Sequence, residues 1–132
     1  MGSIRVGLFH DFKGADTLLL AVDHEGLQSL IAWLREVIAS GRIAAFSDCP
    51  GASVQPRLRI SVARGSGDVG LSRVAETEFV WRRSEAGWLE IIEKLEIIGP
   101  EGHQYLEGPR DAVQVMASIG EYGDEWWQRH GP

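Results

Sequence analysis

The sequence predicts an α+β domain, a mainly antiparallel sheet with two amphipathic helices on one face. Short strand-like segments follow one another with loops or turns between them, and two longer stretches repeat apolar residues at helical spacing. The regular strand–helix alternation of a doubly wound parallel sheet is missing from the pattern. The length of 132 residues suits a single domain, 1–132.

Both helices are defined by apolar stripes and by the residues at their ends. Asp23 and Ser84 are placed as N-caps, Gly41 ends the first helix in a left-handed conformation, and Gly99-Pro100 stop the second. The stripes consist of Leu27, Leu30, Ile31, Leu34, Val37 and Ile38 in the first helix, and Trp88, Ile91, Ile92, Leu95 and Ile98 in the second.

The strand signals are alternating or continuous apolar runs. Ile4–Leu8 and Leu18–Val22 flank the loop His10–Asp16, which predicts a hairpin. Two prolines in Ser47–Pro56 predict a mobile loop. The remaining strand predictions are Arg57–Val62, Glu78–Arg83 and Val113–Ile119, with weaker signals over Val69–Val74 and His103–Leu106.

An internal repeat is suggested by the spacing of the two N-caps, which lie 61 residues apart. At that offset the apolar stripes coincide, as any two capped amphipathic helices would. Gly26 also coincides with Gly87, at the third position of each helix, and helix physics does not require that match. An internal duplication and two unrelated helices both remain open.

Composition excludes several classes of partner. The formal net charge of −6 argues against nucleic acid or an anionic membrane surface. No apolar run approaches the length of a membrane span, and no secretory signal pattern opens the chain, so we expect a cytoplasmic protein. The single cysteine, Cys49, excludes an intramolecular disulfide.

Catalytic and metal motifs are not apparent in the sequence. The histidines His10, His24, His103 and His130 lack metal-ligand spacing, so we expect neither a metal nor a cofactor. No nucleophile elbow is present, and we therefore assign no catalytic residue.

Two segments are candidates for partner binding. His103 and Tyr105 lie two apart on a predicted strand and share one face, which turns outward if Leu106 is buried. The C-terminal tail places Glu121 and Tyr122 before the paired Trp126 and Trp127. The tryptophans either dock on their own domain or meet a partner, because both are costly to leave in water.

The segments Val22–Leu30, Gly102–Leu106 and Val113–Ser118 resemble small bacterial immunity-type proteins of polymorphic-toxin systems. That resemblance implies a compact, non-enzymatic protein that neutralises a cognate partner by occlusion, such as a basic toxin domain. The alternative is a small enzyme or ligand-binding domain that uses His103 and Tyr105, with His24 or Glu107. A homodimer is compatible with either reading.

Overall fold

The computed structural model describes residues 2–12, 14–110 and 113–130. Within them the chain forms two β-sheets and three α-helices, which confirms the α+β class. The large sheet has the order β4-β1-β2-β9-β8 and the small sheet the order β3-β5-β7-β6. The strands of the large sheet are β1 (Ile4–Phe12), β2 (Ala15–Val22), β4 (Ala52–Val54), β8 (Gly102–Arg110) and β9 (Val113–Ile119). Those of the small sheet are β3 (Ala44–Ala45), β5 (Arg59–Arg64), β6 (Gly70–Ala75) and β7 (Glu78–Arg83).

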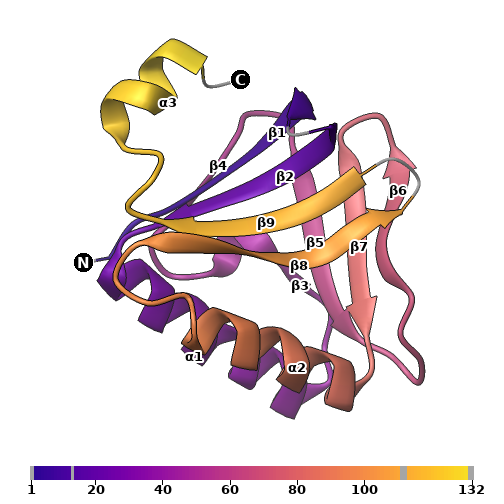
Figure 1. The fold of residues 1–132 in the computed structure, drawn as a ribbon. Helices are drawn as coiled ribbons and strands as arrows, with labels where there is room; N and C mark the ends of the chain where they lie inside the picture. Colours follow the sequence, from indigo (N-terminus) through magenta and orange to yellow (C-terminus); the bar gives the residue numbers. More distant parts are fainter. Residues whose placement is uncertain (1, 13, 111–112, 131–132) are drawn as a thin grey trace.

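The helices lie on both sides of the large sheet. Helices α1 (His24–Ser40) and α2 (Glu85–Glu96) run side by side below it, and α3 (Asp124–His130) lies above its opposite face (Figure 1). A short 3₁₀ helix, η1 (Phe46–Asp48), follows β3. Among the described helices none is long and apolar enough to cross a membrane.

The single, mainly antiparallel sheet expected from the sequence is replaced by two mixed sheets. The antiparallel pairs are β1–β2, β8–β9, β3–β5 and β6–β7. Each sheet is completed by parallel pairing, β2 with β9 in the large sheet and β5 with β7 in the small one. Sequence periodicity describes each strand alone, whereas these parallel pairs join strands from opposite halves of the chain.

The two halves of the chain follow the same order. Each begins with an antiparallel hairpin (β1–β2 or β6–β7), continues into a helix (α1 or α2), and ends with an antiparallel pair (β3–β5 or β8–β9). The last strand of each half then pairs with the hairpin of the other half. Arg35 and Glu96, equivalent positions 61 residues apart, meet at 3.2 Å between the helices. Such a contact between equivalent positions is typical of an approximate two-fold axis.

The predicted N-caps are confirmed. The Asp23 carboxylate accepts from Gly26 N at 2.6 Å, and the Ser84 hydroxyl accepts from Gly87 N at 3.0 Å. Helix α1 stops before Gly41, whose φ of 69° is left-handed as predicted. Helix α2 ends at Glu96, three residues before the predicted stop at Gly99.

Gly26 and Gly87 are both required by the close approach of another segment, a backbone carbonyl at Gly26 and a side chain at Gly87. A Cβ on Gly26 would lie 2.1 Å from the carbonyl oxygen of Ser3, and a Cβ on Gly87 would lie 2.1 Å from Asp68 Oδ1. In each half the segment entering the first hairpin strand therefore crosses directly over the first turn of the helix. The matching glycines have a tertiary cause that the spacing alone does not reveal.

The core lies between the two sheets and the helix pair α1–α2. Its largest fully buried side chains include Trp81 and Trp88, whose ring centroids are 4.9 Å apart. Trp88 Nε1 donates to the carbonyl of Ala63 at 2.9 Å, which joins α2 to β5. The Trp88 indole thus has the polar partner that its buried N–H requires.

An ion pair joins the two sheets at the edge of this core. Glu107 of β8 accepts from both Arg83 Nε, at 2.5 Å, and Arg83 Nη2 of β7. It also accepts from Trp81 Nε1 at 2.8 Å. The side-chain hydrogen bond that Arg83 donates to Glu107 raises the pKa of Arg83. The bidentate geometry fixes how the two sheets meet.

The predicted mobile loop Ser47–Pro56 is instead partly ordered into elements. It contains the end of η1 and the whole of β4, which pairs in parallel with β1. Pro50 and Pro56 flank β4 rather than interrupt it, so they cost no ladder hydrogen bond.

Candidate functional site

The outward side of α2 carries apolar residues that the main stripe does not account for. Leu89, Glu93 and Ile97 follow one another at four-residue steps and so lie on one side of the helix axis. Leu89 is 48% exposed and Ile97 is 70% exposed. Neither residue was predicted as a site residue, although an apolar residue outside the buried stripe of a helix is a signal that the sequence contains.

Carboxylates surround these apolar side chains. Glu90, Glu93, Glu96 and Ile97 line a shallow hollow of about 570 Å³ together with Lys94. Glu96 is paired with Arg35, whereas Glu90 and Glu93 are exposed. The exposed acidic side chains of α1 and α2 are Glu25, Glu36, Glu85, Glu90, Glu93 and Glu96, against the basic Arg35 and Lys94. The helix pair therefore presents a negatively charged surface.

The surface of α2 continues onto the edge strand β8. Lys94 Nζ donates to the carbonyl of Tyr105 at 3.4 Å and so connects the two elements. Leu106 is buried, and His103 and Tyr105 lie on the outward face, as their spacing predicted. Their rings meet edge to face with centroids 5.7 Å apart, and Tyr105 is 39% exposed. Tyr105 pairs with Met116 of the patch under α3, so its side chain lies on the α3 side of the large sheet, and its backbone carbonyl is the group that contacts α2. We call Leu89, Glu90, Glu93, Ile97 and Tyr105, which flank the edge strand β8 from its two sides, the α2–β8 face.

Glu121 connects His103 to the end of β9. Its carboxylate lies 3.0 Å from His103 Nδ1 and 2.5 Å from Ser118 Oγ. A serine–histidine–acid triad places the imidazole between the hydroxyl and the acid. Here the carboxylate is in the middle, and the buried Ser118 hydroxyl donates its hydrogen bond to Glu121 rather than to the imidazole.

The paired tryptophans dock on the outer face of the large sheet. Trp126 and Trp127 each lie 5.4 Å from Phe9, measured between ring centroids. Tyr122 lies 4.5 Å from Trp126 and 5.7 Å from Phe12. The apolar patch beneath them consists of Phe9, Leu19 and Met116, all buried. Of the two alternatives for the tail, the structure shows the chain folded back on its own domain.

Charged contacts hold the first turn of α3 against β1. Arg5 forms an ion pair with Asp124, and its guanidinium lies 5.9 Å from the centroid of the Trp127 ring. Within the helix, Arg129 pairs with Glu125 at 2.7 Å. None of the described residues of α3 is fully buried. The helix is therefore a peripheral element, held by aromatic packing and one ion pair to the domain.

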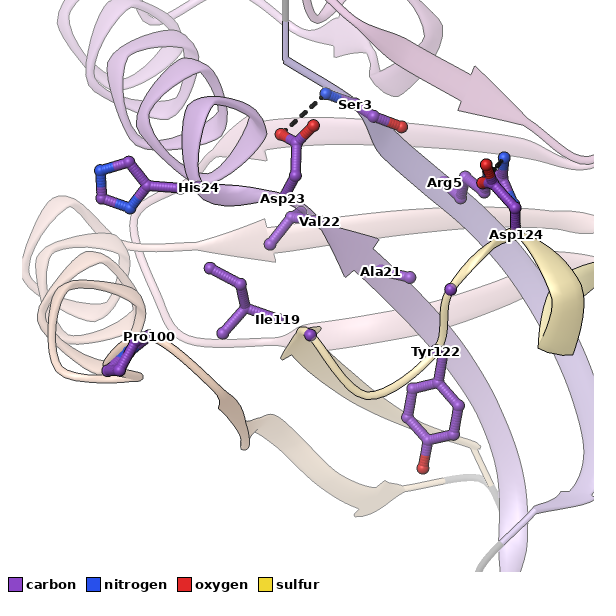
Figure 2. Close-up of a pocket in the computed structure, with 12 residues that line it drawn as sticks. Ser3, Arg5, Ala21, Val22, Asp23, His24, Pro100, Ile119, Tyr122 and Asp124 are labelled. Carbon is purple, nitrogen blue, oxygen red and sulfur yellow. Dashed lines mark hydrogen bonds and ion pairs between the residues drawn. The ribbon is translucent and has the colours of Figure 1, made fainter.

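A crevice of about 560 Å³ opens where β2 and β9 end. Figure 2 shows Asp23, bonded to Ser3, on one side of it, and Arg5 with Asp124 on the other. Val22 and Ile119 form part of its apolar lining. Hydrogen bonding from the Ser3 backbone amide is the main reason that the pKa of Asp23 is lowered from its ordinary value of 3.8.

Neither His24 nor Glu107 joins His103 and Tyr105 in one place. His24 begins α1 and lines the crevice, whose lining includes neither His103 nor Tyr105. Glu107 points into the core toward Arg83. The register of β8 shifts between Tyr105 and Glu107, and after this bulge the Glu107 side chain is buried. The cluster of side chains expected for a small enzyme therefore does not form around His103 and Tyr105.

Metal and thiol chemistry find little support in the described part of the chain. There, no group of three or more His, Cys, Asp or Glu side chains is arranged to hold a metal ion. Cys49 is buried, and burial raises the pKa of its thiol to about 12. A thiol with so high a pKa is a poor nucleophile at neutral pH.

Comparison of the chain with protein-family models, with curated proteins and with solved structures finds no match. The description of the protein therefore rests on its own fold and surface. It is an α+β protein of two mixed sheets, with an acidic helix face beside an exposed aromatic strand edge.

Proposed function

We propose that this chain is a non-enzymatic, immunity-like protein that binds a basic partner protein in the cytoplasm and neutralises it by occlusion. The α2–β8 face is the contact surface in this proposal. The observation that carries it is the exposure of Ile97 in a hollow lined by carboxylates, next to the edge strand on which Tyr105 is exposed.

The α2–β8 face combines exposed apolar and aromatic residues with charged residues around them, as the centre and rim of a protein interface do. Tyr is among the residues most enriched in binding hot spots, and Leu89 and Ile97 add exposed apolar area on the neighbouring helix α2 and at its end. Single exposed apolar residues are ordinary, but here three lie on two adjoining elements. A partner that covers the edge strand β8 from both sides would bury all three.

Charge supports the choice of a basic partner. Glu90 and Glu93 line the same hollow as Ile97, and Glu101 follows a few residues later; all three carboxylates are exposed. Such a field accelerates the encounter with a positively charged protein, and the effect weakens as salt shortens the Debye length to about 8 Å at physiological ionic strength.

The proposal is tested with the purified product of the gene immediately upstream, the position where a toxin partner is expected. Titration calorimetry of the two proteins should show saturable binding. Tyr105→Ala should weaken it by about tenfold or more, because hot-spot truncations cost at least ~2 kcal/mol. Glu93→Lys should slow association and reduce its dependence on salt.

Glu78→Lys is the matched control, since Glu78 is an exposed carboxylate at the start of β7 in the small sheet and does not line the hollow beside α2. It makes the same charge change and should leave association unaltered. Absence of binding between the wild-type proteins, or equal losses from Glu93→Lys and Glu78→Lys, would overturn the proposal.

A further inference from the structure

The crevice beside α3 lies at a topological switch point of the large sheet. Parallel neighbours β2 and β9 end together, at Val22 and Ile119. The chain then leaves β2 for α1 on one side of the sheet and leaves β9 for α3 on the other (Figure 1). In sheets with parallel strands, ligands bind in the crevice outside the carboxyl ends of strands whose connections diverge in this way.

The corresponding position of the small sheet is already occupied by the protein. There the parallel strands β7 and β5 end in Arg83 and Arg64. Arg83 is bound to Glu107, and Arg64 Nη1 donates to the carbonyl of Ile38 at 2.7 Å. In the large sheet the equivalent residues are Val22 and Ile119, which give the crevice an apolar floor.

The charged groups of the crevice favour a cation with a flat donor face. Asp23 and Asp124 line it, against a single arginine, Arg5 (Figure 2). Arg5 shows that a guanidinium fits between the Asp124 carboxylate and the Trp127 ring. The Asp124 side chain is 81% exposed, so one side of its carboxylate is open to a second donor.

We propose that this crevice receives an arginine side chain of the basic partner, with its stem over Val22 and Ile119 and its guanidinium at Asp124. The inference rests on the proposed function, because the arginine comes from the same partner. Pro100 lines the crevice and lies in the segment between α2 and β8, so the crevice adjoins the α2–β8 face.

The test needs no partner protein. The ¹⁵N-labelled full chain is titrated with N-acetyl-L-arginine amide, and N-acetyl-L-citrulline amide serves as the uncharged probe of the same shape. The arginine probe should shift the amide signals of Ser3, Gly120 and Gly123 in a saturable way. The citrulline probe should leave them in place, because it lacks the charge that the carboxylates recognise.

Two variants give opposite expectations. Asp124→Asn should weaken the arginine probe by about tenfold, since a charge-assisted hydrogen bond is lost. Arg5→Gln should strengthen it, because Asp124 loses its internal competitor. Melting midpoints of both variants show whether α3 and the domain remain folded.

Three results would overturn the inference. The first is equal shifts with the citrulline probe, and the second is no shift of the crevice amides with the arginine probe. The third is that acetate competes for the same amide signals and that Arg5→Gln abolishes the effect of acetate. The last would make Arg5 the recognising group and an anion the ligand. None of these results bears on partner binding through the α2–β8 face. If Tyr105→Ala weakens partner binding and Asp124→Asn does not, the proposed function stands and the arginine site is wrong.

Discussion

The junction between hairpin and helix is built twice in this molecule, with the acid and the serine exchanged. In the first half the N-cap is Asp23, and it accepts from the backbone N–H of Ser3 at 3.0 Å. In the second half the N-cap is Ser84, whose backbone N–H and hydroxyl both donate to Asp68, at 3.0 and 2.9 Å. The carboxylate can therefore sit on either partner, provided that it connects the helix start to the segment before the first strand.

The two junctions differ in how rigid the crossing segment is. The group that crosses Gly26 is the backbone carbonyl of Ser3, whereas the group that crosses Gly87 is the side chain of Asp68. A backbone carbonyl next to β1 cannot move without disturbing the strand, but a side chain can rotate. The same sequence feature, a glycine at the third helical position, is thus expected to be needed more strictly in the first half.

Equivalent core residues of the two halves should contribute equally to the free energy of unfolding if the approximate two-fold relation governs packing. Leu30 and Ile91 are equivalent positions and both are essentially inaccessible to solvent. Leu30→Ala and Ile91→Ala should each lower the free energy of unfolding by about 3 kcal/mol, through lost apolar burial and the cavity left behind. Urea denaturation measures both, and a severalfold difference between them would contradict equal packing.

Gly26→Ala and Gly87→Ala test the difference in rigidity. In an ordinary helix interior this substitution stabilises by up to about 1 kcal/mol. Here we expect Gly26→Ala to destabilise by about 2 kcal/mol, because the new methyl group overlaps backbone. Gly87→Ala should cost about 1 kcal/mol, since Asp68 can turn aside. Thermal unfolding of the pair decides the order, and the reverse order would refute the comparison.

The outer faces of the sheets provide a second contrast, because α3 covers only the large sheet. Trp126 is half-buried against Phe9. Trp126→Ala should lower the stability by about 1.5 kcal/mol and leave the affinity for a partner unchanged. Val74→Ala, on the exposed end of β6, should change stability by less than about 0.5 kcal/mol. Loss of affinity without loss of stability in Trp126→Ala would instead place the tryptophan in the interface.

The smallest effect we expect is a pH dependence of the two junctions. Backbone hydrogen bonds, from Ser3 to Asp23 and from Ser84 to Asp68, lower the pKa of both carboxyl groups below the ordinary value of 3.8. Their contribution to stability is therefore complete above that pH and disappears as the pH falls through the lower, folded-state pKa. Asp23→Asn and Asp68→Asn should each flatten the decline in melting midpoint below about pH 4.

A decline in melting midpoint that both asparagine variants retain in full would assign the acid sensitivity to other carboxylates. Asp16, whose pKa is lowered chiefly by the Asp11 amide, is the next group to replace.

Part of the candidate site was predictable from local pattern. The two-residue spacing of His103 and Tyr105 placed both on the outward face because strand side chains alternate. The exposure of Leu89 and Ile97 next to the strand that carries Tyr105 was not predictable, since it depends on α2 packing next to β8. The crevice required still more, because its two walls come from β1 and α3 on one side and from α1 on the other.

By itself, the sequence determined the helices α1 and α2, their N-caps, the strong strands and the excess of negative charge. These depend on interactions between near neighbours: capping hydrogen bonds, side-chain periodicity and composition. Only the tertiary structure decided that the strands divide into two mixed sheets, because β2–β9 and β5–β7 pair across long stretches of chain. It also decided that Glu107 lies inside, that Trp126 and Trp127 dock on the large sheet, and why Gly26 and Gly87 must be glycine. Each of those outcomes depends on contacts between residues far apart in the sequence, and local sequence patterns do not specify those contacts.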